Sequence, residues 1–478
     1  MMRLRYIFCL SITGFLAGCK MTAPQYPVAK TLPDSFGVGA ADTSKSIAAI
    51  PLREFFNDPF LNDLITTTLH ENLDLKIAMQ RITMVQAGIR LGRGALLPSF
   101  NGVVSAGQKR FGDYTMDAIG NYDTNFSENI REDQKLREHM PDYYAGLQSS
   151  WEIDVWGKLR NYKRAALSRF LASEKGKLWV TTSLVAEVAS LYYELLALDN
   201  EIEIINKNIV LQERALEVIQ VQKTAGRANE LGVKQVAAQL FNTKSLQARI
   251  RQEIIEVENH INMLQGRYPQ VISRGKPIME QNLPNALKIG IPAKMLTRRP
   301  DVQQAEYEFI ATKADVRAAR AAFFPSLTIT SAFGLQSFNA SHLIEPGSLA
   351  YSFLGGLTAP LFNKNKIRSD YQVANASGME AFYRYQKVTI TAYQEVVNNL
   401  TRIENFGEVA EYKKDEVEAL NNAVSASNDL FATSFASYLE VITAQRSVLE
   451  AELNLATIRK EQFHAIISLY KSVGGGWE

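Results

Sequence analysis

The residues best able to bind a metal ion or to act as a nucleophile are few in this chain and lie far apart. Its two cysteines are Cys9 and Cys19, and its five histidines are His70, His139, His260, His342 and His464. No His-Glu-x-x-His pattern, Cys/His metal spacing, Gly-x-Ser-x-Gly turn, phosphate-binding glycine loop or dinucleotide fingerprint occurs in the sequence. Acidic pairs such as Glu201 and Glu203 fit the solvated face of a long helix. The sequence therefore predicts no enzyme, no metal site and no cofactor.

One of the cysteines has surroundings that predict a covalent modification. Two arginines precede a mostly apolar segment, residues 6–15, which is too short to span a bilayer, and Leu16-Ala17-Gly18-Cys19 follows at once. This pattern is typical of a bacterial lipobox, in which the signal peptide is cut before the cysteine and the thiol takes a diacylglycerol. We expect a signal peptide at residues 1–18 and a lipidated Cys19, and a plain secretory signal with a chance cysteine is the alternative. Lys20 stands where an aspartate would favour the inner membrane, so the outer membrane is favoured.

The composition is that of an ordinary globular protein, with 46% hydrophobic and 21% charged residues. Without its first 18 residues, which hold two arginines and no acid, the chain carries 50 basic and 50 acidic residues. So balanced a chain lacks the basic surface that nucleic-acid binding requires. After the signal segment no run of about 18 apolar residues occurs, so a membrane crossing would require strands closed into a barrel.

The mature chain contains an internal duplication. The segment that begins at Ala87 and ends at Phe100 recurs from Ala314 to Leu327, with Ala, Arg, Pro and Ser at a constant offset of 227. Further on, Lys158-Leu159-Arg160 recurs as Lys366-Ile367-Arg368, an offset of 208, so the first copy has the longer loop. We expect a proline-containing, lipidated linker at residues 19–59, a first copy at 60–266, a connector at 267–292 and a second copy at 293–478.

Each copy is predicted to contain unusually long helices. No proline occurs between Pro141 and Pro269 or after Pro360, and from position 184 to 209 apolar residues recur at the 3.5-residue period of a coiled-coil seam. A helix over about residues 159–225 would be about 100 Å long at 1.5 Å per residue. We expect a turn between Gly226 and Gly232 and a return helix over 233–264. The second copy should have a helix from about residue 366, a turn near 434–438 and a return helix to 473. A shorter helix carries the same seam at Leu75, Met79, Ile82 and Ile89.

Four segments alternate between apolar or aromatic residues and small polar ones, as strands with two different faces do. They form two predicted hairpins, at residues 98–152 and 325–360, and each strand has about the 10 residues that cross a bilayer when tilted. The charged loop over about 108–141 would then face outside. The alternative is two soluble hairpins that pack on the helices.

Four strands cannot close a barrel within one chain, and open strand edges are not tolerated in lipid. Two chains would supply eight strands, a barrel filled by its own side chains, whereas three would supply twelve and leave room for water. The strand count therefore favours a trimer if the protein is a conduit, and higher orders stay open.

Several longer motifs resemble the outer-membrane factor family, the TolC-type exit ducts of tripartite efflux and secretion systems. They span residues 150–158, 298–306, 318–327, 444–446 and 474–477, so the resemblance covers nearly all of the mature chain. The lipobox is similar to that of the lipoprotein branch, which serves resistance-nodulation-division pumps. The resemblance implies a mostly α fold with transmembrane β: a 12-strand outer-membrane barrel on a periplasmic barrel of long helices, both shared by a homotrimer. It also implies a periplasmic adaptor and an inner-membrane pump as partners.

In that family, inward-coiling helix pairs with acidic residues close the periplasmic end. Glu440 matches one acidic position of the pattern, whereas Thr443 stands where a second acid is common. Three Glu440 carboxylates would repel one another, bind cations and bias a constriction toward cationic cargo. The alternative for Glu440 is a solvated helix-end glutamate.

The same resemblance suggests adaptor contacts at the two helical turns. On the second turn the candidates are Phe435, which stands where a glycine is common, and Ser437. On the first turn they are Gly226, which matches the pattern, with Arg227 and Glu230; Gly232 stands there where an acid is often found. The contact with the adaptor could therefore differ from the family's.

The sequence thus predicts a passive outer-membrane duct for drugs or other small molecules, fed by an inner-membrane pump. A type I-like duct for secreted polypeptides would have the same fold and a different cargo. A lipid-anchored coiled-coil scaffold without a pore is a third hypothesis, and the paired aromatic hairpins argue against it.

Overall fold

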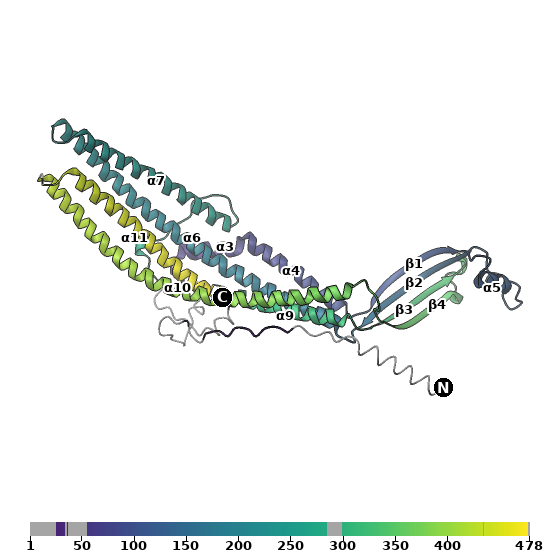
Figure 1. Cartoon of the computed structure of the whole chain (residues 1–478). Coiled ribbons are helices and arrows are strands. Elements are labelled where there is room, and N and C mark those ends of the chain that lie inside the picture. The colour runs from purple at the N-terminus through teal and green to yellow at the C-terminus, as the bar shows by residue number, and fades with distance from the viewer. Residues whose placement is uncertain (1–24, 34–35, 37–54, 284–298, 434, 477–478) are drawn as a thin grey trace. The chain divides into compact units, whose positions relative to one another are not determined.

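The computed structural model describes residues 25–33, 36, 55–283, 299–433 and 435–476 (Figure 1). The predicted signal peptide and Cys19 lie outside the described residues, as do Arg298, Ser434 and Trp477. The chain divides into two compact units. Unit 1 combines residues 1–26, 85–170 and 309–381, and unit 2 combines residues 27–84, 171–308 and 382–478.

The predicted duplication is confirmed, because the same five elements occur twice with matched lengths. The first set is α4 (Leu73–Gly94), β1 (Ser99–Lys109), β2 (Met140–Ile153), α6 (Lys158–Thr224) and α7 (Glu230–Leu264). The second set is α9 (Pro300–Ala321), β3 (Ser326–Ser337), β4 (Leu349–Thr358), α10 (Lys366–Ala432) and α11 (Tyr438–Ser472). The helices have 22, 67 and 35 residues in both sets. The long proline-free segments therefore form the long helices that the sequence predicts.

Several smaller elements have no counterpart in the predicted repeat. Helix α3 (Pro59–Glu71) precedes α4, and α5 (Met116–Thr124) lies in the predicted charged loop. Single 3-10 turns are η2 (Glu132–Gln134), η3 (Ile278–Glu280), η4 (Ala340–His342) and η5 (Pro346–Ser348). Within the described part of the chain, no helix has the length and hydropathy that a bilayer-spanning helix requires.

Unit 1 contains one antiparallel sheet in the order β1-β2-β3-β4. The two copies meet in its middle, where β2 pairs with β3 and Gly146 lies opposite Gly334. A Cβ atom on Gly146 would lie 2.5 Å from the Phe333 carbonyl oxygen and 2.6 Å from the Gly334 Cα. Only glycine allows the two central strands to approach this closely at that point.

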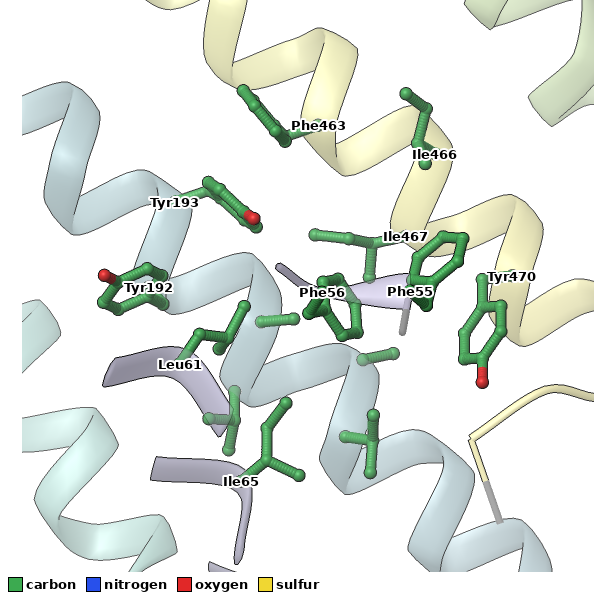
Figure 2. Close-up of a cluster of buried hydrophobic side chains, with 14 of the residues drawn as sticks. Phe55, Phe56, Leu61, Ile65, Tyr192, Tyr193, Phe463, Ile466, Ile467 and Tyr470 are labelled. Atoms are coloured by element: carbon green, nitrogen blue, oxygen red, sulfur yellow. The ribbon is translucent and has the colours of Figure 1, made fainter. Parts of the chain in front are cut away.

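Unit 2 is a helical bundle around an aromatic core (Figure 2). The Tyr193 ring of α6 stacks on the Phe463 ring of α11 with centroids 4.1 Å apart, and Phe55 stacks on Tyr470 at 4.1 Å. Phe55 and Phe56 precede the predicted start of the first copy, yet both are buried in this core. The chain just before α3 therefore contributes to the stability of the bundle.

The predicted helical seams are buried unevenly. In α6 the side chains of Leu184, Val188 and Leu195 are buried, as the 3.5-residue period predicts. In α4, Leu75 is buried near the start of the helix, but Met79 is half exposed. Within a single chain, the seam of the long helix α6 is therefore more completely buried than that of the short helix α4.

Arg299, in the motif at residues 298–306, is the largest fully buried side chain of the bundle. Its guanidinium donates to both carboxylate oxygens of Asp301, at 3.0 and 2.7 Å, and to Glu395 Oε2 of α10 at 2.8 Å. It also donates to the Ser472 carbonyl at the end of α11, at 2.9 Å. One cation therefore ties the start of α9 to α10 and α11.

We predict that Arg299→Ala lowers the free energy of unfolding by about 3–5 kcal/mol, because it leaves two carboxylates without their buried cation. Thermal unfolding in detergent measures the change. Arg131→Ala is the control, since its ion pair with Asp133 is exposed to water and contributes little to stability. Equal melting temperatures for the two variants would contradict the structural role of Arg299.

Candidate functional site

The strand register places most of the large apolar residues of all four strands on one face of the sheet. Gly102 of β1 lies opposite Leu147 of β2, which lies opposite Phe333 of β3, which lies opposite Tyr351 of β4. Neighbouring rows add further large side chains to this face, among them Phe100, Val104, Trp151, Phe353 and Leu357. All of these large side chains are exposed, from 36% for Trp151 to 87% for Val104. An apolar face this exposed needs an apolar environment.

The opposite face of the sheet is polar and nearly uncharged. One row consists of Asn101, Gln148, Ala332 and Ser352, and the larger apolar or aromatic exceptions are Val103, Met140, Tyr144 and Leu354. The strands hold only three charged residues, Lys109, Asp142 and Glu152, and all three lie on this face near the strand ends. The two faces thus match lipid on one side and water on the other, as the sequence alternation predicts.

Both outer strands of the sheet have an unpaired edge within the described residues, since β1 pairs only with β2 and β4 only with β3. These edges are 11 and 10 residues long. Moving backbone N–H and C=O groups out of water without a hydrogen-bond partner costs free energy. A sheet with free edges is therefore incomplete in an apolar environment. No other strand among the described residues supplies the missing partners of these two edges.

The motif at residues 150–158 fastens the end of the sheet to the helices of unit 1. Asp154 accepts hydrogen bonds from the backbone N–H groups of Leu159 and Arg160, at 3.0 and 2.9 Å, and so caps α6. Partial burial acts against ionisation, but these N–H groups and the Arg160 guanidinium hold the pKa of Asp154 below its usual value. Trp156 Nε1 donates to the Pro325 carbonyl at 2.7 Å, and its ring stacks on Phe324. The motif therefore joins the two copies where strand gives way to helix.

The first predicted turn, between α6 and α7, is a tight helical C-cap. Gly226 has φ +74°, and the N–H of Arg227 bonds to the Gln222 carbonyl at 2.8 Å, the pattern of a Schellman motif. Glu230 forms ion pairs with Lys223 and, at 3.5 Å, with Lys234. Gly226, Arg227 and Glu230 are all exposed, and the two lysines offset the charge of Glu230.

The second predicted turn, between α10 and α11, presents an acid and an aromatic ring. The Ser437 hydroxyl bonds to the Glu440 carboxylate, and this bond holds the pKa of Glu440 below its usual value. Glu440 and Thr443 are exposed, and the Thr443 hydroxyl donates to the Leu439 carbonyl at 2.8 Å. The Phe435 side chain is 85% exposed. This turn therefore carries an ionised acid and an uncovered apolar group.

The two turns meet within unit 2, at a residue that the sequence analysis did not single out. Tyr438 and Ile442 of α11 pack against a small cluster of Ile219, Val233 and Val236 from α6 and α7. The Tyr438 hydroxyl is buried there with no hydrogen-bond partner, and this burial raises its pKa to about 12. The sequence marks Tyr438 only as a turn residue, because which helix covers it depends on the packing of the two hairpins.

Other chemistry has little support in the structure. The described residues contain no group of three His, Cys, Asp or Glu side chains placed to hold a metal ion. The candidate residues fall into two sets: the two faces and edges of the sheet in unit 1, and the two turns in unit 2. Lipidation of Cys19 stays a prediction, since that residue lies outside the described part.

Comparisons with known proteins agree with this geometry. The sequence model of one family, described as outer membrane efflux protein, matches residues 64–267 and 291–475. The chain is 28% identical over 469 residues to the solvent efflux pump outer membrane protein SrpC of Pseudomonas putida, covering 97% of this chain and 96% of that protein. It is 25% identical to the probable outer membrane lipoprotein SilC of Salmonella typhimurium, covering 98% of each. The solved structure of the outer-membrane channel OprN shares the fold, with a TM-score of 0.83 at 24% identity over 95% of this chain and 99% of that one.

Removing the Tyr438 hydroxyl should stabilise the helical unit. We predict that Tyr438→Phe raises the free energy of unfolding by about 1 kcal/mol, because a buried, unpaired hydroxyl is lost and the ring packing stays. The difference from the parent chain should change above pH 10, since the unfolded tyrosine ionises before the folded one, whose pKa is about 12, and the hydroxyl then destabilises the parent further. Chemical denaturation at pH 7 and at pH 11 measures both effects, and a less stable Tyr438→Phe chain would show that the hydroxyl is satisfied.

Proposed function

Because the chain belongs to the outer membrane efflux protein family, we propose that three copies of it form the passive exit channel of a tripartite efflux system. The observation that supports this most directly is the sheet of unit 1, which has one exposed apolar face, one polar face and two unpaired edges. Pairing β1 of each copy with β4 of the next would satisfy every edge at once. Twelve strands would then enclose a water-filled lumen lined by the polar face.

The long helices would continue this conduit into the periplasm. The 67-residue helices α6 and α10 and their 35-residue partners have the lengths that such an extension needs. No catalytic step is required of the chain, since a duct conducts its cargo and the energy comes from the inner-membrane pump.

The exposed turns are the proposed contacts with a periplasmic adaptor. Gly226, Arg227 and Glu230 lie on the first turn, and Phe435 and Ser437 on the second. An uncovered phenylalanine beside mixed charges suits a protein partner better than it suits bulk water. Glu440 and Thr443 are the proposed periplasmic gate.

Two further parts of the proposal draw on the relatives. Small molecules are the proposed cargo, because SrpC is named as a solvent efflux pump component, and this favours efflux over polypeptide secretion. Lipidation of Cys19 and anchoring in the outer membrane are proposed from the lipobox and from the lipoprotein name of SilC.

The lipid face and the lumen face can be tested with neighbouring residues of β4. We predict that Phe353→Lys lowers the yield of assembled protein in the outer membrane, because a lysine in the apolar band costs roughly 2–4 kcal/mol. Ser352→Lys is the matched control on the opposite face and should assemble normally. Immunoblots of outer-membrane fractions compare the two. If Phe353→Lys assembled normally and Ser352→Lys did not, the assignment of the lipid face and the lumen face would be wrong.

The gate can be tested by conductance in planar bilayers. The purified protein should form ion-conducting pores, and Glu440→Gln should lower their preference for cations. Glu230→Gln is the control at the sister turn, where lysines already offset the charge, and should change the preference less. Cation preference should fall on acidification as Glu440 gains a proton, and Ser437→Ala should move this loss to higher pH, because the bond that lowers the pKa is gone. No conductance would contradict the channel, whereas a Glu440→Gln pore with unchanged selectivity would contradict only the gate.

A further inference from the structure

The N-terminal segment that precedes α3 contacts the rest of the protein through Tyr26. Among residues 25–33, only Tyr26 and Leu32 are partly buried, and all their neighbours are exposed. In unit 1 the Tyr26 ring meets the Phe309 ring of α9 edge to face, with centroids 5.0 Å apart. The Lys313 ammonium lies 5.7 Å from the centre of the Tyr26 ring and 5.0 Å from that of Phe309. Tyr26 is therefore held by defined contacts. The site around it, formed by Phe309, Lys313 and Gly378, is called the seat below.

On its other side, Tyr26 packs against Gly378 of α10, where no side chain fills the space. A Cβ atom at Gly378 would lie 2.7 Å from the Tyr26 hydroxyl oxygen and 3.5 Å from Val316 of α9. A side chain at position 378 would therefore occupy the space that the hydroxyl uses. Glycine inside a helix costs about 1 kcal/mol relative to alanine, and at position 378 the missing side chain leaves the space that the Tyr26 hydroxyl occupies.

The internal duplication provides a comparison within the same chain. Gly378 is the thirteenth residue of α10, and the thirteenth residue of α6 is Phe170. Phe309 is the tenth residue of α9, and the tenth residue of α4 is Ile82. The first copy thus has a bulky side chain where the second has space, and no aromatic ring where the second has one. Among the described residues, the seat is formed by the second copy alone.

The position of the seat matches the reach of the residues before Tyr26. Phe309 lies 12 residues before the end of α9, and Gly378 lies 12 residues after the start of α10. At 1.5 Å per residue, the seat is about 18 Å along the helices from the ends that adjoin the sheet. Cys19 precedes Tyr26 by seven residues, which can span at most about 23–25 Å. The segment can reach the sheet end of the helices with little slack.

We infer that the seat formed by Phe309, Lys313 and Gly378 is a docking site for Tyr26, which fixes the N-terminal segment to α9 and α10 and sets the reach of the lipid anchor. Docking itself depends only on the described contacts. The consequence for the anchor rests on the proposed lipidation of Cys19, and the two parts are tested separately.

Docking is tested by photo-crosslinking of the full-length protein in outer membranes. Tyr26 is replaced by 3-azidotyrosine, which keeps the phenolic hydroxyl in place, and mass spectrometry maps the products. The expected link joins residue 26 to the peptides that contain Phe309, Lys313 or position 378. The same probe at the exposed Gln25 is the matched control and should link roughly ten-fold less, as the loss of an aromatic contact implies.

Two substitutions of the seat decide whether the space at Gly378 matters. Gly378→Ala and Gly378→Leu should both lower the yield of the link from position 26, although alanine favours the helix. Gly407→Ala, at an α10 glycine with no atoms near its missing Cβ, should leave the yield unchanged. An unchanged yield in both Gly378 variants, or links to other peptides, would overturn the docking site.

The reach is tested by deleting residues 21–24, which leaves about 10 Å of chain between Cys19 and Tyr26. If Cys19 is lipidated, this deletion should pull Tyr26 out of its seat and lower the link yield. Cys19→Ser in the same chain should restore the yield when residues 1–18 are replaced by an ordinary secretory signal peptide, which is removed without lipidation. A shortened, lipidated chain that links normally would overturn the proposed reach. The lipid itself is read from the mass of the mature N-terminal peptide, so a failure of lipidation is distinguished from a failure of docking.

Discussion

Unpaired backbone groups cannot be left in lipid, and this constraint governs the whole molecule. In the described sheet, the outer edges of β1 and β4, 11 and 10 residues long, are unpaired. Its apolar face exposes many large side chains, which is unfavourable in water. Both problems disappear if identical sheets join edge to edge, because every edge is then paired and every apolar face meets lipid. The polar row of Asn101, Gln148 and Ser352 then needs water, and the enclosed lumen supplies it. Oligomerisation and conduction follow from the same sheet.

The rest of the chain supports this sheet at fixed points. Asp154 and Trp156 join strand ends to helix starts, so that the sheet cannot rotate freely on its helices. In the bundle, the buried Arg299 holds α9, α10 and α11 of the second copy together, and the aromatic core joins α11 to α6 of the first copy. The turn between α10 and α11 is less well satisfied, because the Phe435 side chain is exposed and the Tyr438 hydroxyl is buried without a hydrogen-bond partner. This difference between the core and the end of the bundle is compatible with the gate proposed at Glu440 and Thr443.

The sequence was sufficient to predict the features that depend on local chemistry or on period. The absence of proline predicted the long helices, and the alternation of residue types predicted four strands with the correct faces. Features that depend on contacts between distant segments could not be predicted in this way. The break between α3 and α4 depends on Asn72, whose side chain caps Leu75 and also donates to the Leu264 carbonyl, 192 residues away. Likewise, the motif that contains Arg299 was visible, but its partners Glu395 and Ser472 are known only from the fold.

The central claim is that β1 of one copy pairs with β4 of the next, and disulfide formation between these two edges tests it most directly. A chain with one cysteine in β1, at Val104, and a second scanned along β4 should give cross-linked products that end at three chains on a denaturing gel. Links that form only within single chains would contradict this pairing. The same holds if no position in β4 links at all while the protein is assembled in the membrane.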